Sequence, residues 1–243
     1  MYPYIYSSDS FTLGSYGLFL AIAYLTGRWY FLTNLERAYP KVQNTEYLII
    51  LLLVLGVVGA KLMFILKNPD KSDLVFSGNG FSSQGALIGA LIATYVYTQF
   101  NKIMLHTLLD AAAPAAILAY AIARVGCFLS GDDCHGIESD LPWAMSFPNG
   151  IEPTDKKVHP VPLYEIIYSL IIFTVLIARK YREKIPYEQF FLLLGLWGVC
   201  RFMVEFITTN ERVILSMSGS QIGALLMVIS STIYYLMRKK AKA

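Results

Sequence analysis

Residues 111–131 read AAAPAAILAYAIARVGCFLSG, and residues 132–165 continue with DDCHGIESDLPWAMSFPNGIEPTDKKVHPVPLYE. The first stretch is an apolar run long enough to cross a bilayer, which takes roughly 20 residues. The second is polar and rich in glycine and proline. Arg124 lies near the end of the first apolar run, and Glu165 lies at the start of the next. Charged residues in membrane spans are costly and usually belong to a functional site, so we expect a site around these two residues.

The composition of the whole chain is that of a membrane protein. Of the 243 residues, 56% are hydrophobic and only 15% are charged, and the mean hydropathy is +0.50. Soluble domains carry about 25% charged residues. The N-terminus lacks a basic segment followed by a small-residue cleavage site, so we expect no removable signal peptide. These features predict an all-α polytopic membrane protein.

Apolar runs of spanning length predict about seven transmembrane helices. The expected spans are about 12–32, 46–66, 82–99, 103–129, 161–179, 188–207 and 219–237. The connections are short except for the segment at about 130–160, where we expect a small extramembrane cap of turns and short strands between the fourth and fifth helices. Without an internal repeat, we expect one integral membrane domain over residues 1–243.

Lysine and arginine decide the expected orientation, because they concentrate on the cytoplasmic side of membrane proteins. With the N-terminus outside, the twelve inner residues are Arg28, Arg37, Lys41, Lys102, Arg179, Lys180, Arg182, Lys184, Arg238, Lys239, Lys240 and Lys242. The five outer residues are Lys67, Lys71, Lys156, Lys157 and Arg212. We therefore expect the N-terminus outside and the C-terminus in the cytoplasm. The net charge of +3 then reflects a basic inner rim, and we expect no nucleic-acid partner.

Polar residues recur at one depth, near the outer ends of six expected helices. They are Tyr16, Lys61, Ser83 with Gln84, Arg124, Glu165, and Arg201 with Glu205. Residues with unrelated structural roles would not share a depth, so we expect one cavity that opens toward the outer leaflet.

Structural explanations for the same residues stay open. Arg201 and Glu205 are four residues apart and can neutralise each other on one helix face. Lys61 can extend to the outer interface. Tyr16 and Trp197 can be interfacial aromatics.

The three cysteines lack CxxC spacing and give no disulfide framework. Cys127 and Cys200 lie in apolar runs, as packing residues do, and a Cys127–Cys134 disulfide stays an alternative. Residues 132–135 (Asp, Asp, Cys, His) are of metal-ligand types. Because consecutive residues on one loop make a poor closed site, we expect no metal.

The two arginines indicate an anionic ligand. The guanidinium groups of Arg124 and Arg201 can bind phosphate oxygens bidentately, and Gly126, Gly131 and Gly136 let the backbone approach a ligand closely. The anion available at this depth is a phospholipid headgroup. The residues alone therefore predict a membrane protein that takes an anionic phospholipid from the outer leaflet.

Several motifs follow one another along the chain. They are SYGLFLAIAY (15–24), GAKLMF (59–64), QGALIGA (84–90), DAAAPAAILAYAIARVGCFLSGDDCHG (110–136), PWAMSFPNG (142–150), HPVPLYE (159–165) and RFMVEF (201–206). In this order they resemble the bacterial prolipoprotein diacylglyceryl transferases. The resemblance implies transfer of the diacylglyceryl group of phosphatidylglycerol to the lipobox cysteine of a preprolipoprotein, with release of glycerol phosphate.

The resemblance also implies roles for individual residues. Arg124 corresponds to the arginine of the family signature and Arg201 to a second essential arginine, both holding the phosphate, while Glu205 orients Arg201 or takes a proton. The residues expected to bind substrate are Tyr16, Lys61, Gln84, Gly85, Gly126, Gly131, Gly136, Glu165 and Trp197.

The chain departs from the family pattern at several positions. Gln84, Gly85 and Ala86 stand where many members have a histidine and two glycines, and glutamine is no general base at neutral pH. Cys127 replaces the asparagine of the signature, and Trp197 replaces a tyrosine.

Either another residue acts as the general base, or the reaction proceeds without one. We expect His159, at the outer mouth of the fifth helix and next to Glu165, to be catalytic. His135, Asp132, Asp133 and Glu205 are the alternatives.

The leading hypothesis is a lipoprotein-modifying transferase in the cytoplasmic (inner) membrane of a bacterium, with its active site toward the outer leaflet. The expected partners are phosphatidylglycerol or another anionic phospholipid and a lipobox-containing preprolipoprotein. We expect a monomer without a cofactor. A related enzyme with a different acceptor and a non-catalytic phospholipid-binding or translocating protein are the alternatives.

Overall fold

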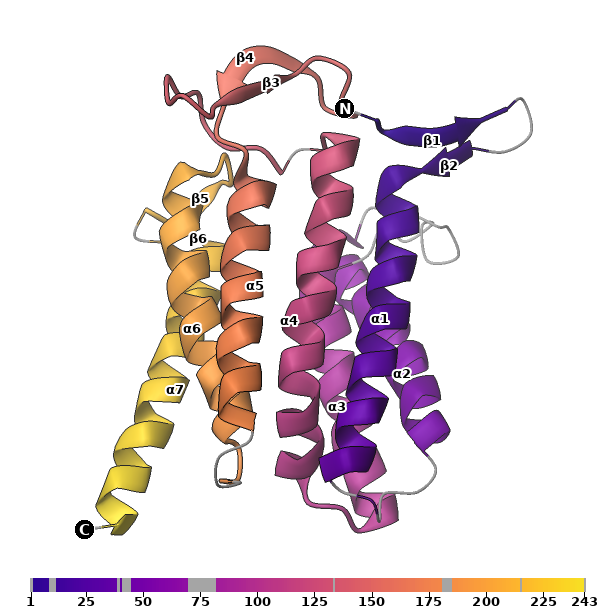
Figure 1. Cartoon of the computed structure of the whole chain (residues 1–243), viewed down its shortest axis with the longest axis vertical. Helices are drawn as coiled ribbons and strands as arrows, with labels where there is room; N and C mark the ends of the chain where they lie inside the picture. Colours follow the sequence, from indigo (N-terminus) through magenta and orange to yellow (C-terminus); the bar gives the residue numbers. More distant parts are fainter. Residues whose placement is uncertain are drawn as a thin grey trace. The chain divides into compact units, whose positions relative to one another are not determined.

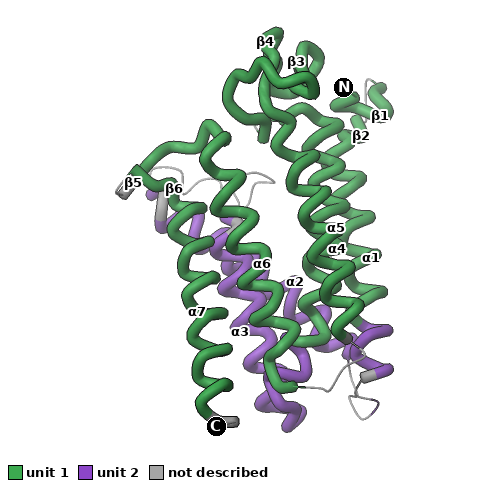
Figure 2. Tube along the Cα trace, turned by 60° about the vertical axis from the view of Figure 1, so that its left-hand side comes forward, with its two compact units in different colours: residues 1–31, 110–243 green, residues 32–109 purple. Residues whose placement is uncertain are grey.

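The chain divides into two compact units in this computed structural model, which describes residues 2–8, 12–38, 40, 45–69, 82–132, 134–180, 185–214 and 216–242. One unit comprises Met1–Phe31 and Asp110–Ala243, and the other comprises Leu32–Leu109 (Figure 2). The expectation of a single domain stays a prediction.

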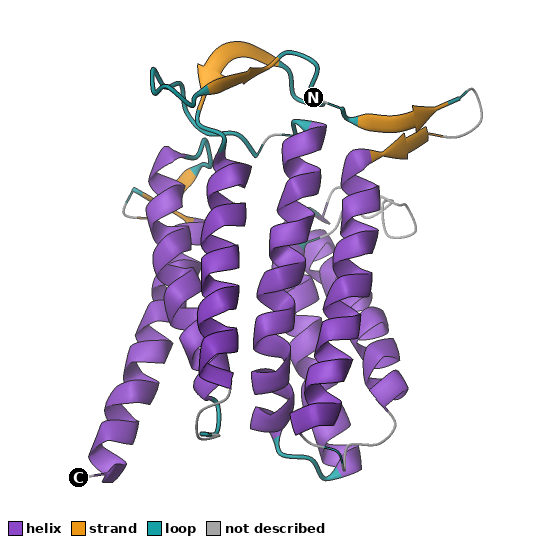
Figure 3. Ribbon diagram, in the orientation of Figure 1, coloured by secondary structure: helices purple, strands orange, loops and turns teal. Residues whose placement is uncertain are grey.

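Helices dominate both units (Figures 1 and 3). They are α1 (Ser15–Ala38), α2 (Thr45–Lys67), α3 (Ser83–Asn101), α4 (Leu105–Ser130), α5 (Val161–Lys180), α6 (Glu188–Val204) and α7 (Gly219–Lys242). Each overlaps one of the expected spans, although α1 and α7 extend further toward the C-terminus than expected. Five stretches among the described helices are long and apolar enough to cross a membrane: Thr45–Leu66, Leu105–Ser130, Val161–Arg179, Glu188–Ile207 and Gly219–Lys240. This agrees with an all-α membrane protein, while membrane crossing by α1 and α3 stays a prediction.

Short antiparallel strand pairs flank the helices. Strand β1 (Tyr4–Ser7) pairs with β2 (Thr12–Gly14), β3 (Met145–Phe147) with β4 (Thr154–Val158), and β5 (Arg212–Ile214) with β6 (Met217–Ser218). The β3–β4 pair lies in the expected cap between α4 and α5. The other two pairs were not predicted from the sequence, because strands of two to four residues carry too short an alternation to detect.

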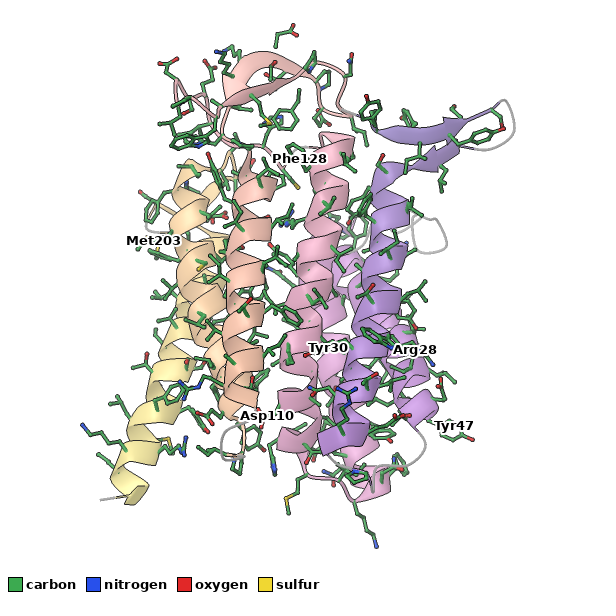
Figure 4. All side chains as sticks on the ribbon, in the orientation of Figure 1. Arg28, Tyr30, Tyr47, Asp110, Phe128 and Met203 are labelled. Atoms are coloured by element: carbon green, nitrogen blue, oxygen red, sulfur yellow. The ribbon has the colours of Figure 1, made fainter. Side chains whose placement is uncertain are left out.

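The larger unit has its core where α4, α5 and α6 meet. Buried residues from the three helices pack together there: Ala113, Ile117, Tyr168, Ile172, Leu176 and Leu193. Asp110 lies at the end of α4 away from Phe128 (Figure 4). Its Oδ1 accepts a hydrogen bond of 3.0 Å from the backbone N–H of Phe190 in the first turn of α6. This carboxylate therefore caps a neighbouring helix, satisfying a donor that no intrahelical carbonyl can reach.

The smaller unit is built on the close contact between α2 and α3. A Cβ on Gly89 would overlap the carbonyl of Leu55, and a Cβ on Gly85 would overlap the carbonyl of Gly59. Small residues four apart on one face allow two helix backbones to approach closely in a membrane. The side chain of Ser82 caps α3 and accepts from the N–H of Gly85.

Candidate active site

Glu165, near the start of α5, is the centre of a buried ionic cluster. Its side chain is 0% exposed. The Oε2 atom pairs with Nε of Arg124 on α4, and the Oε1 atom pairs with Nη1 of Arg201 on α6. One carboxylate thus joins three helices. Because an isolated buried charge is very costly, each member of such a cluster depends on the others.

Two tyrosines complete the surroundings of this carboxylate. The hydroxyl of Tyr120 donates to Glu165 Oε1 over 3.0 Å and accepts from Arg124 Nη2 over 3.0 Å. The hydroxyl of Tyr168 is 3.5 Å from the same Oε1 atom. The guanidinium of Arg124 also lies 5.0 Å from the centroid of the Tyr120 ring, a cation–π distance. The orientation of Arg124 is therefore fixed from several sides.

Glu205 holds Arg201 from the other side. The distance from Arg201 Nη2 to Glu205 Oε2 is 2.9 Å, one helical turn along. The Oε1 atom of Glu205 accepts from Asn210 Nδ2 at 2.7 Å and from Ser218 Oγ at 2.6 Å. Neutralisation of Arg201 by Glu205 is thus only part of the arrangement, since Arg201 also pairs with Glu165.

Two free thiols lie against Arg124. Its Nη1 atom is 3.3 Å from Cys134 Sγ and 3.6 Å from Cys127 Sγ. The two sulfurs and a carboxylate oxygen of Asp132 lie within 4.8 Å of one another. Contact with Cys127 and burial raise the pKa of the Cys134 thiol. A guanidinium in contact with both sulfurs opposes the approach of a divalent cation, which is an electrostatic argument against a metal here.

A polar cavity of about 90 Å³ opens between the charged groups. Its lining residues are Arg124, Cys134, His135, Val161, Glu165, Arg201, Thr208, Thr209 and Asn210. The volume suits a small polar group rather than a whole lipid. Two guanidinium groups and an amide at its wall are donors of the kind that bind phosphate oxygens.

Three of the four glycines expected to bind substrate belong to the larger unit and lie in closely packed surroundings. Gly126 lies where a Cβ would be 3.2 Å from the Cα of Tyr16, Gly131 has a φ of +58°, and Gly136 faces the carbonyl of Ile207. Only glycine adopts a positive φ without strain. These positions hold the backbone in place, and direct contact with a ligand stays a prediction.

The remaining predicted residues lie in several places. Trp197 packs edge-to-face on Tyr120, with 5.3 Å between ring centroids. His159 is not among the cavity-lining residues, whereas His135 is. Lys61, Gln84 and Gly85 belong to the smaller unit, so their part in the site stays a prediction. Asp133 lies outside the described residues.

Sequence reasoning missed Tyr120, Tyr168, Asn210 and Ser218. Tyr120 precedes Arg124 by four residues and Tyr168 follows Glu165 by three, the spacing of side-chain neighbours on a helix. That signal was available in the sequence. Asn210 lies just before β5 and Ser218 ends β6, and no local pattern indicates that both reach Glu205.

Comparison with known proteins gives consistent matches over nearly the whole chain. The sequence model of the family described as prolipoprotein diacylglyceryl transferase matches residues 3–237. A protein of Dehalococcoides mccartyi named phosphatidylglycerol–prolipoprotein diacylglyceryl transferase is 30% identical over 98% of this chain and 95% of its own length. A protein of the same name from Clostridioides difficile is 27% identical over 93% of this chain and 90% of its own length. Another from Clostridium tetani is 32% identical over 72% of this chain and 72% of its own length.

Proposed function

This chain belongs to the prolipoprotein diacylglyceryl transferase family, and we propose that it transfers the diacylglyceryl group of phosphatidylglycerol to the cysteine thiol of a prolipoprotein. The observation that carries the proposal is the family match over residues 3–237. The pair of buried arginines at a polar cavity supports it, since the reaction needs a site for a phosphate.

The reaction has simple requirements. The sulfur of the acceptor cysteine attacks the glycerol carbon that bears the phosphate, a carbon–sulfur bond forms, and the carbon–oxygen bond breaks. Glycerol phosphate leaves with the electron pair, and the thiol proton goes to a base. The barrier falls when cationic donors already surround the departing phosphate and when the thiol is ionised.

Arg124 and Arg201 are the residues to receive the phosphate. Each side chain is 18% exposed, and both line the cavity. Their guanidinium groups stay charged in a buried site and can bind two oxygens each. Glu205 holds Arg201 in place over 2.9 Å, and Glu165 keeps both arginines together until a substrate phosphate replaces it.

Catalysis would take place at the outer leaflet of the bacterial inner membrane. Seven crossings with the N-terminus outside would place the β3–β4 cap and the cavity on that side, in agreement with the distribution of lysine and arginine. A monomer suffices, because the ionic cluster is made by a single chain. Lys61, Gln84 and Tyr16 would contact the lipid headgroup. The base predicted from the sequence is His159.

The test is a transfer assay with purified protein in micelles of phosphatidylglycerol and a synthetic peptide with a lipobox cysteine. Mass spectrometry should detect the peptide with an added diacylglyceryl group and an equal amount of glycerol phosphate. A peptide with serine in place of that cysteine is the control. If the lipid binds but neither product forms, the transferase function is wrong. Consumption of lipid without peptide modification would indicate another acceptor.

A further inference from the structure

His135 is the histidine of the cavity wall. It lines the cavity together with Arg124, Arg201, Glu165 and Cys134. Its Nδ1 atom is buried and has no hydrogen-bond partner among the described residues. A buried polar atom in that condition calls for an explanation, and a role in catalysis is one of the recognised explanations.

The imidazole ring and the adjacent backbone are both held by contacts with the protein. The ring packs against Phe147 with 5.7 Å between centroids. The next residue, Gly136, donates its N–H to the carbonyl of His159 over 2.8 Å and forms a β-bridge with Thr208. His135 is therefore fixed at the backbone, while its imidazole lines the cavity and its buried Nδ1 atom makes no hydrogen bond with the described residues.

His159 is engaged elsewhere. Its Nδ1 atom is 3.1 Å from the hydroxyl of Tyr164, and that hydroxyl accepts from Trp143 Nε1 at 2.7 Å. The Tyr164 hydroxyl can therefore donate its own hydrogen to His159 Nδ1, which occupies the lone pair of that nitrogen. The third histidine, His106, is at the start of α4, far along that helix from Arg124.

We propose that His135 is the general base of the transfer reaction. The inference rests on the proposed function and names the residue that takes the proton. The acceptor thiol gives its proton to the imidazole of His135 as sulfur bonds to the glycerol carbon, and glycerol phosphate departs toward Arg124 and Arg201 with the electron pair. The carboxylate of Glu165 in the same cavity offers a charge opposite to that of the imidazolium.

The assignment fits the substitution at position 84. A glutamine cannot remove a proton at neutral pH, so a general base in this chain must be a residue other than Gln84. An imidazole at the wall of the cavity proposed to hold the phosphate can serve that purpose without a metal or a second thiol.

The experiment measures the rate of peptide modification from pH 6 to pH 9 for the wild type, His135→Gln, His159→Gln and His106→Gln. Loss of a general base lowers rates about 10²–10⁴-fold. The His135→Gln variant should lose at least about 10²-fold near pH 7 and recover as the pH approaches the ordinary thiol pKa of about 8.5. The His106→Gln variant should match the wild type. The His159→Gln variant should keep the pH profile of the wild type, whatever its rate.

Two further measurements guard against a folding defect. Binding of phosphatidylglycerol by His135→Gln should equal that of the wild type, and added imidazole should restore part of the rate of His135→Ala. A His135→Gln profile parallel to that of an active wild type, or the pH-dependent loss in His159→Gln instead, would overturn the assignment while leaving the transferase function intact. An inactive wild type would overturn the proposed function itself.

Discussion

Glu165 on α5 forms an ion pair with Arg201 on α6. Its second oxygen pairs with Arg124 on α4, so the carboxylate joins the three helices at the wall of the cavity. Two guanidinium groups beside one carboxylate would repel each other in a medium of low polarity if that carboxylate were absent. The carboxylate is therefore as necessary for the fold as for the site.

Replacing Glu165 by glutamine should destabilise the protein strongly. Loss of one partner from a buried ion pair costs about 3–5 kcal/mol, because the remaining charge is left uncompensated. Denaturant unfolding in micelles measures the change. The matched control is Glu138→Gln, whose side chain is 63% exposed and pairs with Lys156, and which should leave stability unchanged. Equal stability of the two variants would contradict a structural role for the Glu165 charge.

Replacing either Arg124 or Arg201 by lysine should reduce transfer by about 10²-fold or more, the usual effect of losing a donor to a developing oxyanion. Lysine keeps the charge but loses the planar fork. The transfer assay measures the effect, and unfolding measures whether the fold is retained. Arg179→Lys is the control. Arg179 lies in the last turn of α5, at the opposite end from Glu165, and pairs with Glu188 at the start of α6. Full activity in both variants would exclude the two-arginine phosphate site.

The orientation prediction can be tested with reporters. A tag after Ala243 should be cytoplasmic, and one inserted within residues 145–157 should be outside, because lysine and arginine favour the cytoplasmic side. Enzymatic reporters that work on only one side of the membrane give the answer. If both tags report the same side, the orientation is wrong.

Cys127 and Cys134 should form a disulfide on exposure to oxidised glutathione. Their sulfurs lie within 4.8 Å of each other, and the two thiols lose two protons and two electrons while the oxidant yields two reduced glutathione molecules. Oxidation removes two sulfur contacts from Arg124, so transfer should slow and recover on reduction.

Mass spectrometry should find a peptide pair joined at residues 127 and 134, and 2 Da lighter than the two thiols. Cys200, on α6, is the internal control and should remain alkylatable. Two free thiols after oxidation, or slowing that persists in a Cys134→Ser variant, would contradict this prediction.

Gly89→Ala should destabilise the smaller unit, because the new Cβ would overlap the carbonyl of Leu55 in α2. Overpacking of this kind costs about 1–3 kcal/mol. Gly223→Ala in α7, where a Cβ meets nothing within 4 Å, should instead stabilise its helix by up to about 1 kcal/mol. Thermal unfolding of the two variants compares them, and a Gly89→Ala variant as stable as Gly223→Ala would count against the close helix contact.

The helices could be predicted because each apolar run is a local property of the sequence. The run at 161–179 corresponds to α5 (Val161–Lys180) almost residue for residue. The β1–β2 and β5–β6 pairs could not be predicted, since strands of this length depend on turns and neighbours rather than on alternation.

The charged residues of the site could also be predicted from the sequence. Arg124, Glu165, Arg201 and Glu205 were expected at one depth, and the structure brings them together. The choice between His135 and His159 was not accessible in this way. It depends on which histidine is hydrogen-bonded to a tyrosine, and that is decided by how the cap folds over the ends of the helices.

The ionic cluster also bears on the release of the product. Arg124 and Arg201 carry two positive charges, and Glu165 and Glu205 carry two negative ones. In the proposed reaction, an anionic headgroup would therefore enter by exchanging places with a carboxylate that never leaves the protein. The same carboxylate competes with the product once glycerol phosphate has formed, at an effective concentration that no free ion can match. In the proposed reaction, Glu165 would thus act as a built-in competitor that keeps the enzyme from being inhibited by its own product.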